Sequence, residues 1–447
     1  MSGTSGISPE LLSRFAAAFH ADEKNTIRQC AIVKKGISDA AENHQAQIDN
    51  PMLFSLELKD TGKVTDQKAS GRCWLFAALN TMRCEVMRRL NLDTFELSEN
   101  YLLFWDKLEK SNAFLDSMIE NADEPLDGRL VSFLMEKSTR DGGQWDMYAA
   151  LVDKYGCVPK SVMPETFHSS NTGVMNRLLS AKLREDTAIL RDAVRGKSAD
   201  VARLREEMLQ DIYNFLAICL GEPPATFDFE CRDKDGNFTR DAGISPPAFF
   251  AKYIGLDLAD YVSVINAPTH DKSYGETYTI AYMDNVIGGH SAKYLNLPFD
   301  DLRRLALAQL ADGRPVWFVC DVGQMCDREK GLLALNAFDY GCAAGLSLSF
   351  GKAGRLDYSM TDCTHAMVLI GVNLVDGKPT RWKVENSWGD KSGQDGYYVM
   401  SDDWFAEHGF QVVVSRKYLS TQQREAYERP PVVLPPWDSM RRALAEM

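Results

Sequence analysis

Several features that direct a protein to a membrane or out of the cell are missing from this 447-residue sequence. Its longest strongly apolar stretch runs only from Ala366 to Val375 and is interrupted by polar and glycine residues, whereas a bilayer-spanning helix needs about 20 apolar residues. Its N-terminus, MSGTSGISPELLSRF, lacks the basic start, apolar stretch and cleavage site of a secretion signal. We therefore expect a cytoplasmic protein with no membrane partner.

Cysteine and positive charge are also in short supply. The ten cysteines include no CxxC pair, and Cys363 and His365 have no matching second pair of metal ligands, so neither a metal nor a dense disulfide framework is expected. Lys and Arg number 50 against 63 for Asp and Glu, and the net charge of −13 disfavours nucleic acid as a partner. The run from Gly345 to Ala353 has the wrong spacing for a phosphate loop and lacks its Ser or Thr. We expect no cofactor.

The sequence contains two halves of different character. In the first half, Leu75, Leu79, Met82, Val86 and Leu90 form one apolar stripe at helical spacing. Two helical runs between residues 175 and 220, separated near residue 196, predict an αα-hairpin, and the run DKDGNF at 233–238 predicts the turn of a β-hairpin. After residue 261 the sequence turns to short β-rich runs, at 261–265, 315–323, 365–375, 381–388, 396–401 and 410–419. This order predicts an α+β fold with two packed lobes.

Cys73 lies where a polar, glycine-bearing loop gives way to the apolar helical stripe. A cysteine in the first turn of a helix faces the positive end of the helix dipole, which favours a thiolate and suits a nucleophile. A free cysteine is more often a small buried hydrophobic residue, so this position alone does not decide. Gln67, six residues earlier, is an ordinary loop amide in the second case, whereas beside a nucleophile its NH2 group can point at a developing oxyanion.

Two further motifs lie in the β-rich half. His365 opens the apolar strand that follows Thr364, and taken alone it is more simply a strand-end histidine than a catalytic one. Asn386 follows the run RWKVE and precedes Ser387 and Trp388. An asparagine in such a place can orient an imidazole through its side-chain oxygen while the indole keeps water from that hydrogen bond, as a Cys-His-Asn mechanism requires.

In this order the motifs resemble those of the papain-like cysteine peptidases. The family's Gln, Gly-x-Cys-Trp, His-Ala and Asn-Ser-Trp-Gly motifs match Gln67, Gly71 to Trp74, His365-Ala366 and Asn386 to Gly389. Smaller matches are Leu97-Ser98-Glu99, Gly142-Gly143 with Trp145, and Gly396-Tyr397. The resemblance implies that Cys73 attacks the substrate, His365 moves the proton, Asn386 orients His365, Gln67 binds the oxyanion, and Trp74 and Trp388 support them.

The spacing of the motifs narrows the resemblance to one branch. From Cys73 to His365 the separation is 365 − 73 = 292 residues, against roughly 130 to 150 in the simple papain pattern. A core with such insertions, and the ending LPPWDSM at 434–440, is similar to the bleomycin hydrolase and bacterial aminopeptidase C branch. That likeness implies a cytoplasmic aminopeptidase acting on peptides and a ring-like homohexamer. Arg72 stands where many papain relatives carry serine.

The resemblance also implies an organisation along the chain. We expect a two-lobe papain-like fold, one lobe helical and one resembling a β-barrel, with large helical insertions and two arms. The expected segments are a helical arm at 1–60, a helical lobe at 61–165 with an insertion at about 105–140, a helical insertion with a hairpin at 166–260, a β-rich lobe at 261–425 and a C-terminal arm at 426–447.

The C-terminal arm is expected to enter the active-site cleft, where Ala443, Leu444 and Ala445 would restrict the access of substrates. Three alternatives stay open at this point. One is an endopeptidase with an open cleft, the second is a DNA-binding oligomer with secondary peptidase activity, and the third is a scaffold without catalysis. The last is disfavoured because every catalytic position is filled.

Overall fold

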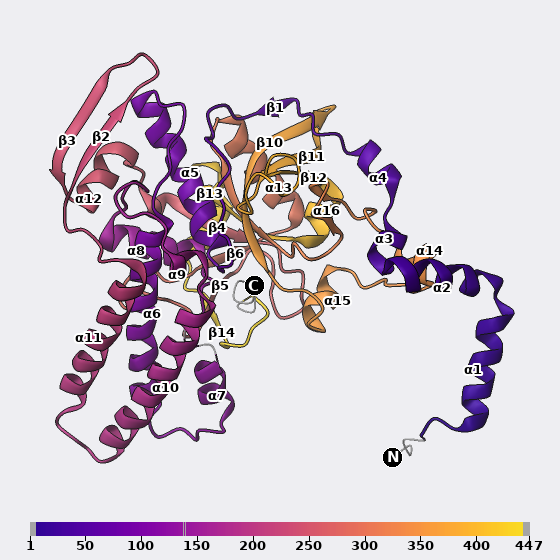
Figure 1. The fold of residues 1–447 in the computed structure, drawn as a ribbon, viewed down its shortest axis with the longest axis horizontal. Coiled ribbons are helices and arrows are strands. Elements are labelled where there is room, and N and C mark those ends of the chain that lie inside the picture. Colours follow the sequence, from indigo (N-terminus) through magenta and orange to yellow (C-terminus); the bar gives the residue numbers. More distant parts are fainter. Residues whose placement is uncertain (1–5, 137, 139, 441–447) are drawn as a thin grey trace.

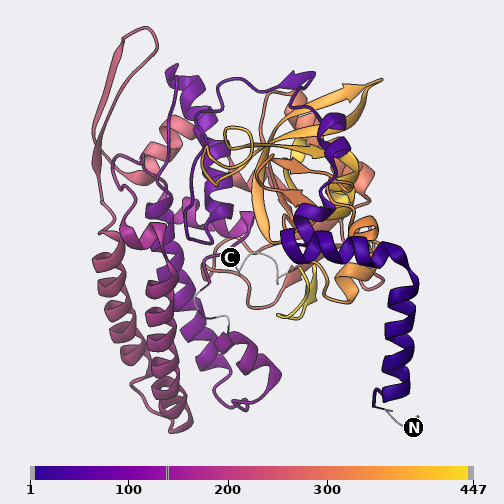
Figure 2. The ribbon, with the colours of Figure 1, turned by 45° about the vertical axis from the view of Figure 1, so that its right-hand side comes forward.

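A layer of helices packs against a large mixed β-sheet, and the two meet along helix α5 (Cys73–Leu90). The computed structural model describes residues 6–136, 138 and 140–440. Figures 1 and 2 show the helices between Cys73 and Leu220 on one side of the molecule and the strands of the second half on the other, with the N-terminal helices beyond the strands. The predicted α+β architecture with two packed lobes is confirmed.

The sheet of the second lobe is continuous, in the order β14-β5-β6-β4-β13-β7-β10-β11-β12-β9-β8, with β1 added beside β10. The strands are β1 (Leu56–Glu57), β4 (Tyr261–Ile265), β5 (Thr277–Ile280), β6 (Tyr294–Asn296), β7 (Val316–Cys320), β8 (Cys326–Asp327), β9 (Leu332–Leu333), β10 (His365–Val375), β11 (Lys378–Glu385), β12 (Tyr397–Ser401), β13 (Gly409–Ser415) and β14 (Val432–Leu434). The β-rich runs of the sequence are these strands.

Both faces of the central strands are covered, which explains why their sequences are almost continuously apolar. Alternate residues of β7 and β10 face opposite ways: Trp317 and Ala366 pack toward the helical lobe, while Phe318 and Met367 join a second core. Two helices cover that second face, α13 (Phe299–Ala311) and α16 (Asp402–His408). Two short helices, α14 (Tyr340–Ala344) and α15 (Lys352–Asp357), lie in the segment that leads to β10.

The helical lobe is built around α5, which buries the predicted apolar stripe. Ser98 caps the next helix by accepting a hydrogen bond from the backbone N–H of Tyr101. The αα-hairpin and the β-hairpin both form. The elements of this lobe are α6 (Glu99–Glu120), α7 (Arg129–Glu136), α8 (Trp145–Tyr155), α9 (Phe167–Ser170), α10 (Gly173–Arg195), α11 (Val201–Leu220), β2 (Phe227–Arg232), β3 (Phe238–Ile244), α12 (Pro246–Phe249), η1 (Phe250–Ile254) and η2 (Leu258–Asp260).

The N-terminal segment begins with α1 (Pro9–Ala21) and α2 (Glu23–Lys35), neither of which has a buried residue, followed by α3 (Ile37–Ala41) and α4 (His44–Asp49). In both views α1 projects away from the two lobes. The end of this segment differs from a free arm, because β1 pairs with β10 and so belongs to the sheet.

The C-terminal segment is also tied to the β-rich lobe. After η3 (Arg416–Tyr418) and α17 (Thr421–Glu428), β14 pairs in parallel with β5. Asp438 then forms an ion pair of 3.0 Å with the nearly buried Lys272, and Met440 is buried. Across the described part of the chain, no helix combines the length and the apolar character needed to cross a bilayer.

Candidate active site

Cys73 is the first residue of α5, and its side chain is 2% exposed. No side chain caps the start of this helix, so the backbone N–H groups of Cys73 and Trp74 are available to stabilise negative charge. The backbone N–H groups of Ala366 and Trp74 are close enough to the Cys73 thiol to lower its pKa. The contact with Ala366 places the sulfur next to the start of β10, across the boundary between the lobes.

His365 and Asn386 come from two neighbouring strands, at the start of β10 and just beyond the end of β11. Nε2 of His365 lies 2.7 Å from Oδ1 of Asn386, and the same oxygen accepts a hydrogen bond of 2.7 Å from the backbone N–H of Ser387. The hydrogen bond from Ser387 identifies this atom as the amide oxygen and not the amide nitrogen. An amide oxygen can only accept, so the imidazole donates through Nε2. Nδ1 of His365 is buried and has no hydrogen-bond partner among the described residues, so it is the nitrogen left for a nucleophile and a substrate.

Trp388 covers the His365–Asn386 pair. Its ring stacks on the imidazole with centroids 4.6 Å apart and an angle of 28° between the planes. The guanidinium of Arg328 lies over the ring of Trp388, 4.5 Å from its centroid. Trp74, which is fully buried, donates from its indole to the backbone oxygen of Asp141 at 2.7 Å. The two tryptophans thus support opposite sides of the site, Trp74 in the helical lobe and Trp388 over the base.

Gln67 lies in a loop that contacts both motifs, and it is 1% exposed. Its backbone N–H donates to the oxygen of Ser387 at 2.8 Å, and its side-chain oxygen accepts from the hydroxyl of Ser387 at 2.7 Å. One amide hydrogen is used by the oxygen of Ser70 at 2.6 Å. No described residue accepts the other hydrogen of the NH2 group, and an amide so fixed can donate to an oxyanion without reorganising.

Burial dominates the electrostatics of the two titratable groups. Desolvation raises the pKa of the Cys73 thiol to about 11, although backbone hydrogen bonds lower it. Desolvation also lowers the pKa of His365 to about 4, against the hydrogen bond to Asn386 and together with the charge of Arg328. These shifts favour the neutral thiol and imidazole, so the thiolate that we expected from the helix dipole alone is opposed by burial.

A proton transfer within the pair changes this balance. Moving the proton from Cys73 to His365 creates a thiolate beside an imidazolium, and the attraction between the two charges opposes both desolvation shifts. Burial opposes ionisation of either group alone, so an ion pair of Cys73 and His365 would require both charges to form together.

The loop before Cys73 is held by buried charges that motif spacing did not reveal. Arg72 is fully buried and forms a bidentate pair with Glu165, at 3.0 and 2.7 Å. Asp141 accepts from the backbone N–H of Gly71 at 3.0 Å and pairs with Lys107 at 2.6 Å. Burial opposes ionisation of Asp141, but Lys107 and these hydrogen bonds outweigh it and lower its pKa.

A second buried pair joins the two lobes behind the site. Arg83, on α5, and Glu385, the residue before Asn386, are 1% and 2% exposed, and their side chains meet at 2.6 Å. Asn80 donates to the same carboxylate at 2.8 Å. Desolvation raises the pKa of Glu385 to about 7, while the charge of Arg83 lowers it. The helix that carries Cys73 is thus fastened to the strand that carries Asn386.

The structure also shows what the remaining candidates do. Lys352, in the rejected phosphate loop, is buried and donates to Asn266 and to the backbone oxygens of Ala406 and Gly409. Residues Ala443, Leu444 and Ala445 lie outside the described residues.

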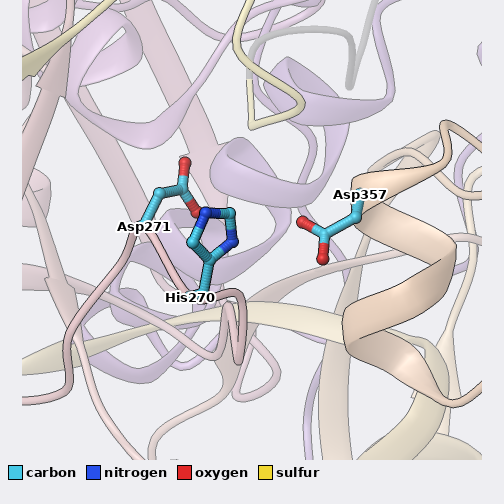
Figure 3. A group of neighbouring side chains, drawn as sticks. All are labelled: His270, Asp271 and Asp357. Atoms are coloured by element: carbon cyan, nitrogen blue, oxygen red, sulfur yellow. The ribbon is translucent and has the colours of Figure 1, made fainter.

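One cluster has the side-chain types of a metal site. The potential ligand atoms of His270, Asp271 and Asp357 lie within 4.8 Å of one another. Figure 3 shows these three side chains. All three residues are exposed, and Asp271 already pairs with Lys272 at 2.9 Å. We assign no metal to this cluster.

Comparisons with known proteins identify the family of the chain. Residues 6–441 match the Peptidase C1-like family, so the chain belongs to that family and is a papain-like cysteine peptidase. It is 49% identical to aminopeptidase C of Streptococcus thermophilus, over 97% of this chain and 98% of that protein. It is 43% identical to aminopeptidase G of Lactobacillus delbrueckii subsp. lactis, over 96% of this chain and 98% of that protein.

A solved structure gives the same result. The crystal structure of PepW from Lactobacillus rhamnosis HN001 has a TM-score of 0.97 and 47% identity, over 99% of this chain and all of that one. Together, the family and these relatives make this chain a cysteine-type aminopeptidase of the papain-like class.

Proposed function

We propose that this enzyme removes N-terminal residues from peptides in the cytoplasm through a Cys-His-Asn thioester mechanism. The observation that carries the proposal is the 2.7 Å hydrogen bond between His365 Nε2 and Asn386 Oδ1, with Nδ1 left unpaired among the described residues beside the start of α5. The aminopeptidase relatives support the exopeptidase reaction over an endopeptidase. The dispersed cysteines support a reducing compartment.

In the proposed first half-reaction, the sulfur of Cys73 attacks the scissile carbonyl and its proton passes to Nδ1 of His365. The carbonyl oxygen becomes an oxyanion, which accepts from the side chain of Gln67 and the backbone N–H of Cys73. The imidazolium then gives its proton to the leaving amine as the C–N bond breaks. Asn386 holds the ring throughout and accepts no proton.

In the second half-reaction, a water molecule attacks the thioester. His365 takes one proton from the water and returns it to the sulfur as the C–S bond breaks, releasing the N-terminal residue as an acid. The atoms of the peptide and one water are thus all accounted for, and no metal or cofactor is part of the scheme.

We also propose a homohexamer whose subunits contact each other through the N-terminal arm. Helices α1 and α2 have no buried residue. Their exposed apolar residues include Leu12, Phe15, Ile27 and Val33, at 55%, 56%, 71% and 80% exposure. Such a face is costly to leave in water and fits another copy of the chain. Sedimentation of the full chain and of a variant lacking residues 1–35 tests this. The shorter protein should form oligomers with fewer subunits than the full chain does.

The catalytic part of the proposal is tested by Cys73→Ser, with Cys84→Ser on the same helix as a matched control. The first change should abolish turnover of an unblocked aminoacyl amide without changing the melting temperature, because a hydroxyl is a far weaker acid than a thiol. Residual turnover above a few per cent of wild type would refute the assignment of the nucleophile.

The exopeptidase part is tested by deleting residues 441–447, the expected substrate-gating end of the arm. The deletion should make N-acetylated peptides into substrates and weaken the preference for a free amine. A truncated enzyme that still rejects blocked peptides would assign the gating to another element.

A further inference from the structure

Arg328 carries an exposed positive charge beside the site that the catalytic scheme does not use. It follows β8 directly, and its guanidinium lies over the ring of Trp388 at 4.5 Å. No carboxylate pairs with it anywhere in the described residues, and the neighbouring Asp327 lies 3.7 Å from Lys330 instead. An arginine held by an aromatic ring is partly preorganised to bind a carboxylate, because less side-chain freedom is lost on binding.

The position of Arg328 relative to the reacting atoms is set by Trp388. The same indole stacks on His365 at 4.6 Å, so the guanidinium, the indole and the imidazole form one contiguous group. The charge of Arg328 is close enough to lower the pKa of His365. Arg328 therefore lies on the side of the site where the base operates.

The direction of the reaction identifies which part of a substrate lies there. The leaving amine must receive its proton from His365, so it lies within hydrogen-bonding distance of the imidazole at that step. The residue that carries this amine, and the one after it, consequently leave the site past His365 and Trp388. Arg328, which lies over Trp388, is a charged group beside that path.

We propose that Arg328 is a specificity-determining residue that favours substrates with a carboxylate in the first one or two residues after the scissile bond. This inference rests on the proposed peptidase function and adds a substrate class to it. Two groups supply this chemistry: the terminal carboxylate of a dipeptide and the side chain of an acidic residue. A guanidinium binds either one through two parallel hydrogen bonds.

The test uses three substrates in competition: Leu-Ala, Leu-Ala amide and Leu-Glu amide. Competition in one tube gives ratios of kcat/KM directly, so any effect of a variant on His365 acts on all substrates alike and cancels. Arg328→Gln should lower the preference for Leu-Ala or Leu-Glu amide over Leu-Ala amide by about fivefold, the effect of one partly exposed ion pair. Arg328→Lys should keep part of that preference.

The matched control is Arg424→Gln, which removes an exposed arginine from α17. It should leave both ratios unchanged. A loss confined to Leu-Ala identifies the terminal carboxylate as the ligand, and a loss confined to Leu-Glu amide identifies the side chain. Unchanged ratios in Arg328→Gln, or an equal fall in the control, overturn the inference.

A failure of the proposed function looks different. If N-acetyl-Leu-Ala is cleaved as well as Leu-Ala, the exopeptidase assignment is wrong, whereas the Arg328 ratios measured on blocked peptides still support or overturn the inference about the carboxylate.

Discussion

Replacing Arg83 by methionine should destabilise the protein in a way that depends on pH. The change leaves the carboxyl group of Glu385, which is 2% exposed, without its cation. It also removes the hydrogen bond of 2.7 Å that Arg83 donates to the backbone oxygen of Lys63. Removing one partner of a buried ion pair typically costs about 3–5 kcal/mol. Part of that cost disappears when the carboxyl group takes up a proton.

The sign of the pH effect follows from the pKa of about 7 for Glu385 in the wild-type fold. Below pH 7 the group is protonated in both proteins, so only the lost hydrogen bonds and packing separate them. Above pH 7 the wild type holds a carboxylate while the variant must keep its proton. The difference in unfolding free energy should therefore grow by about 1.4 kcal/mol for each pH unit above 7.

Urea unfolding between pH 6 and pH 9 measures this difference, with Arg88→Met as the control on the same helix. Arg88 is 68% exposed and pairs with Glu85, so its replacement should cost well under about 1 kcal/mol at every pH. Because Glu385 precedes Asn386, Arg83→Met should also lower kcat more than it raises KM. A cost that does not change with pH, or one no larger than that of the control, would refute the reasoning.

The other predictions concern the oxyanion, the base and a second buried carboxyl group. Gln67→Ala should lower kcat by ~10² to 10³ with little change in KM, because the oxyanion exists only in the transition state; an unchanged kcat would make Gln67 a loop residue. Asn386→Ala should lower kcat less than Gln67→Ala does, because Asn386 orients the imidazole and accepts no proton. Steady-state kinetics should also show a narrower pH optimum for this variant. Desolvation raises the pKa of Asp146 from 3.8 to about 7, so the folded protein keeps a proton that the unfolded chain loses. The unfolding free energy therefore falls as pH rises from 3.8 through 7. The unfolding free energy of Asp146→Asn should then equal that of the wild type near pH 4 and exceed it at pH 8 by on the order of 4 kcal/mol. Equal unfolding free energies at pH 8 would contradict this.

The parts of the fold that sequence could predict are those with a local signal. The helix after Cys73 begins where the polar loop ends, and β10 begins at His365, because the apolar spacing changes at those residues. The αα-hairpin likewise follows from a break near Gly196.

The parts that sequence could not predict depend on contacts between distant residues. Arg83 and Glu385 are 302 residues apart, and no sequence motif indicates that they pair. Arg72 was visible only as a departure from serine, and its pairing with Glu165 needed the fold. The pKa shift of Cys73 had the same origin, since burial was not apparent from its place in a helix.

The division of the site between α5 and the strands β10 and β11 has a consequence during synthesis of the chain. The nucleophile is made first, and 365 − 73 = 292 residues must follow before His365 exists. At roughly 5 to 20 residues per second, this takes ~15 to 60 s. On the proposed mechanism, a growing chain therefore has a sulfur without a base and cannot cut itself or its neighbours. Peptidase activity begins only when the last third of the chain has joined the sheet.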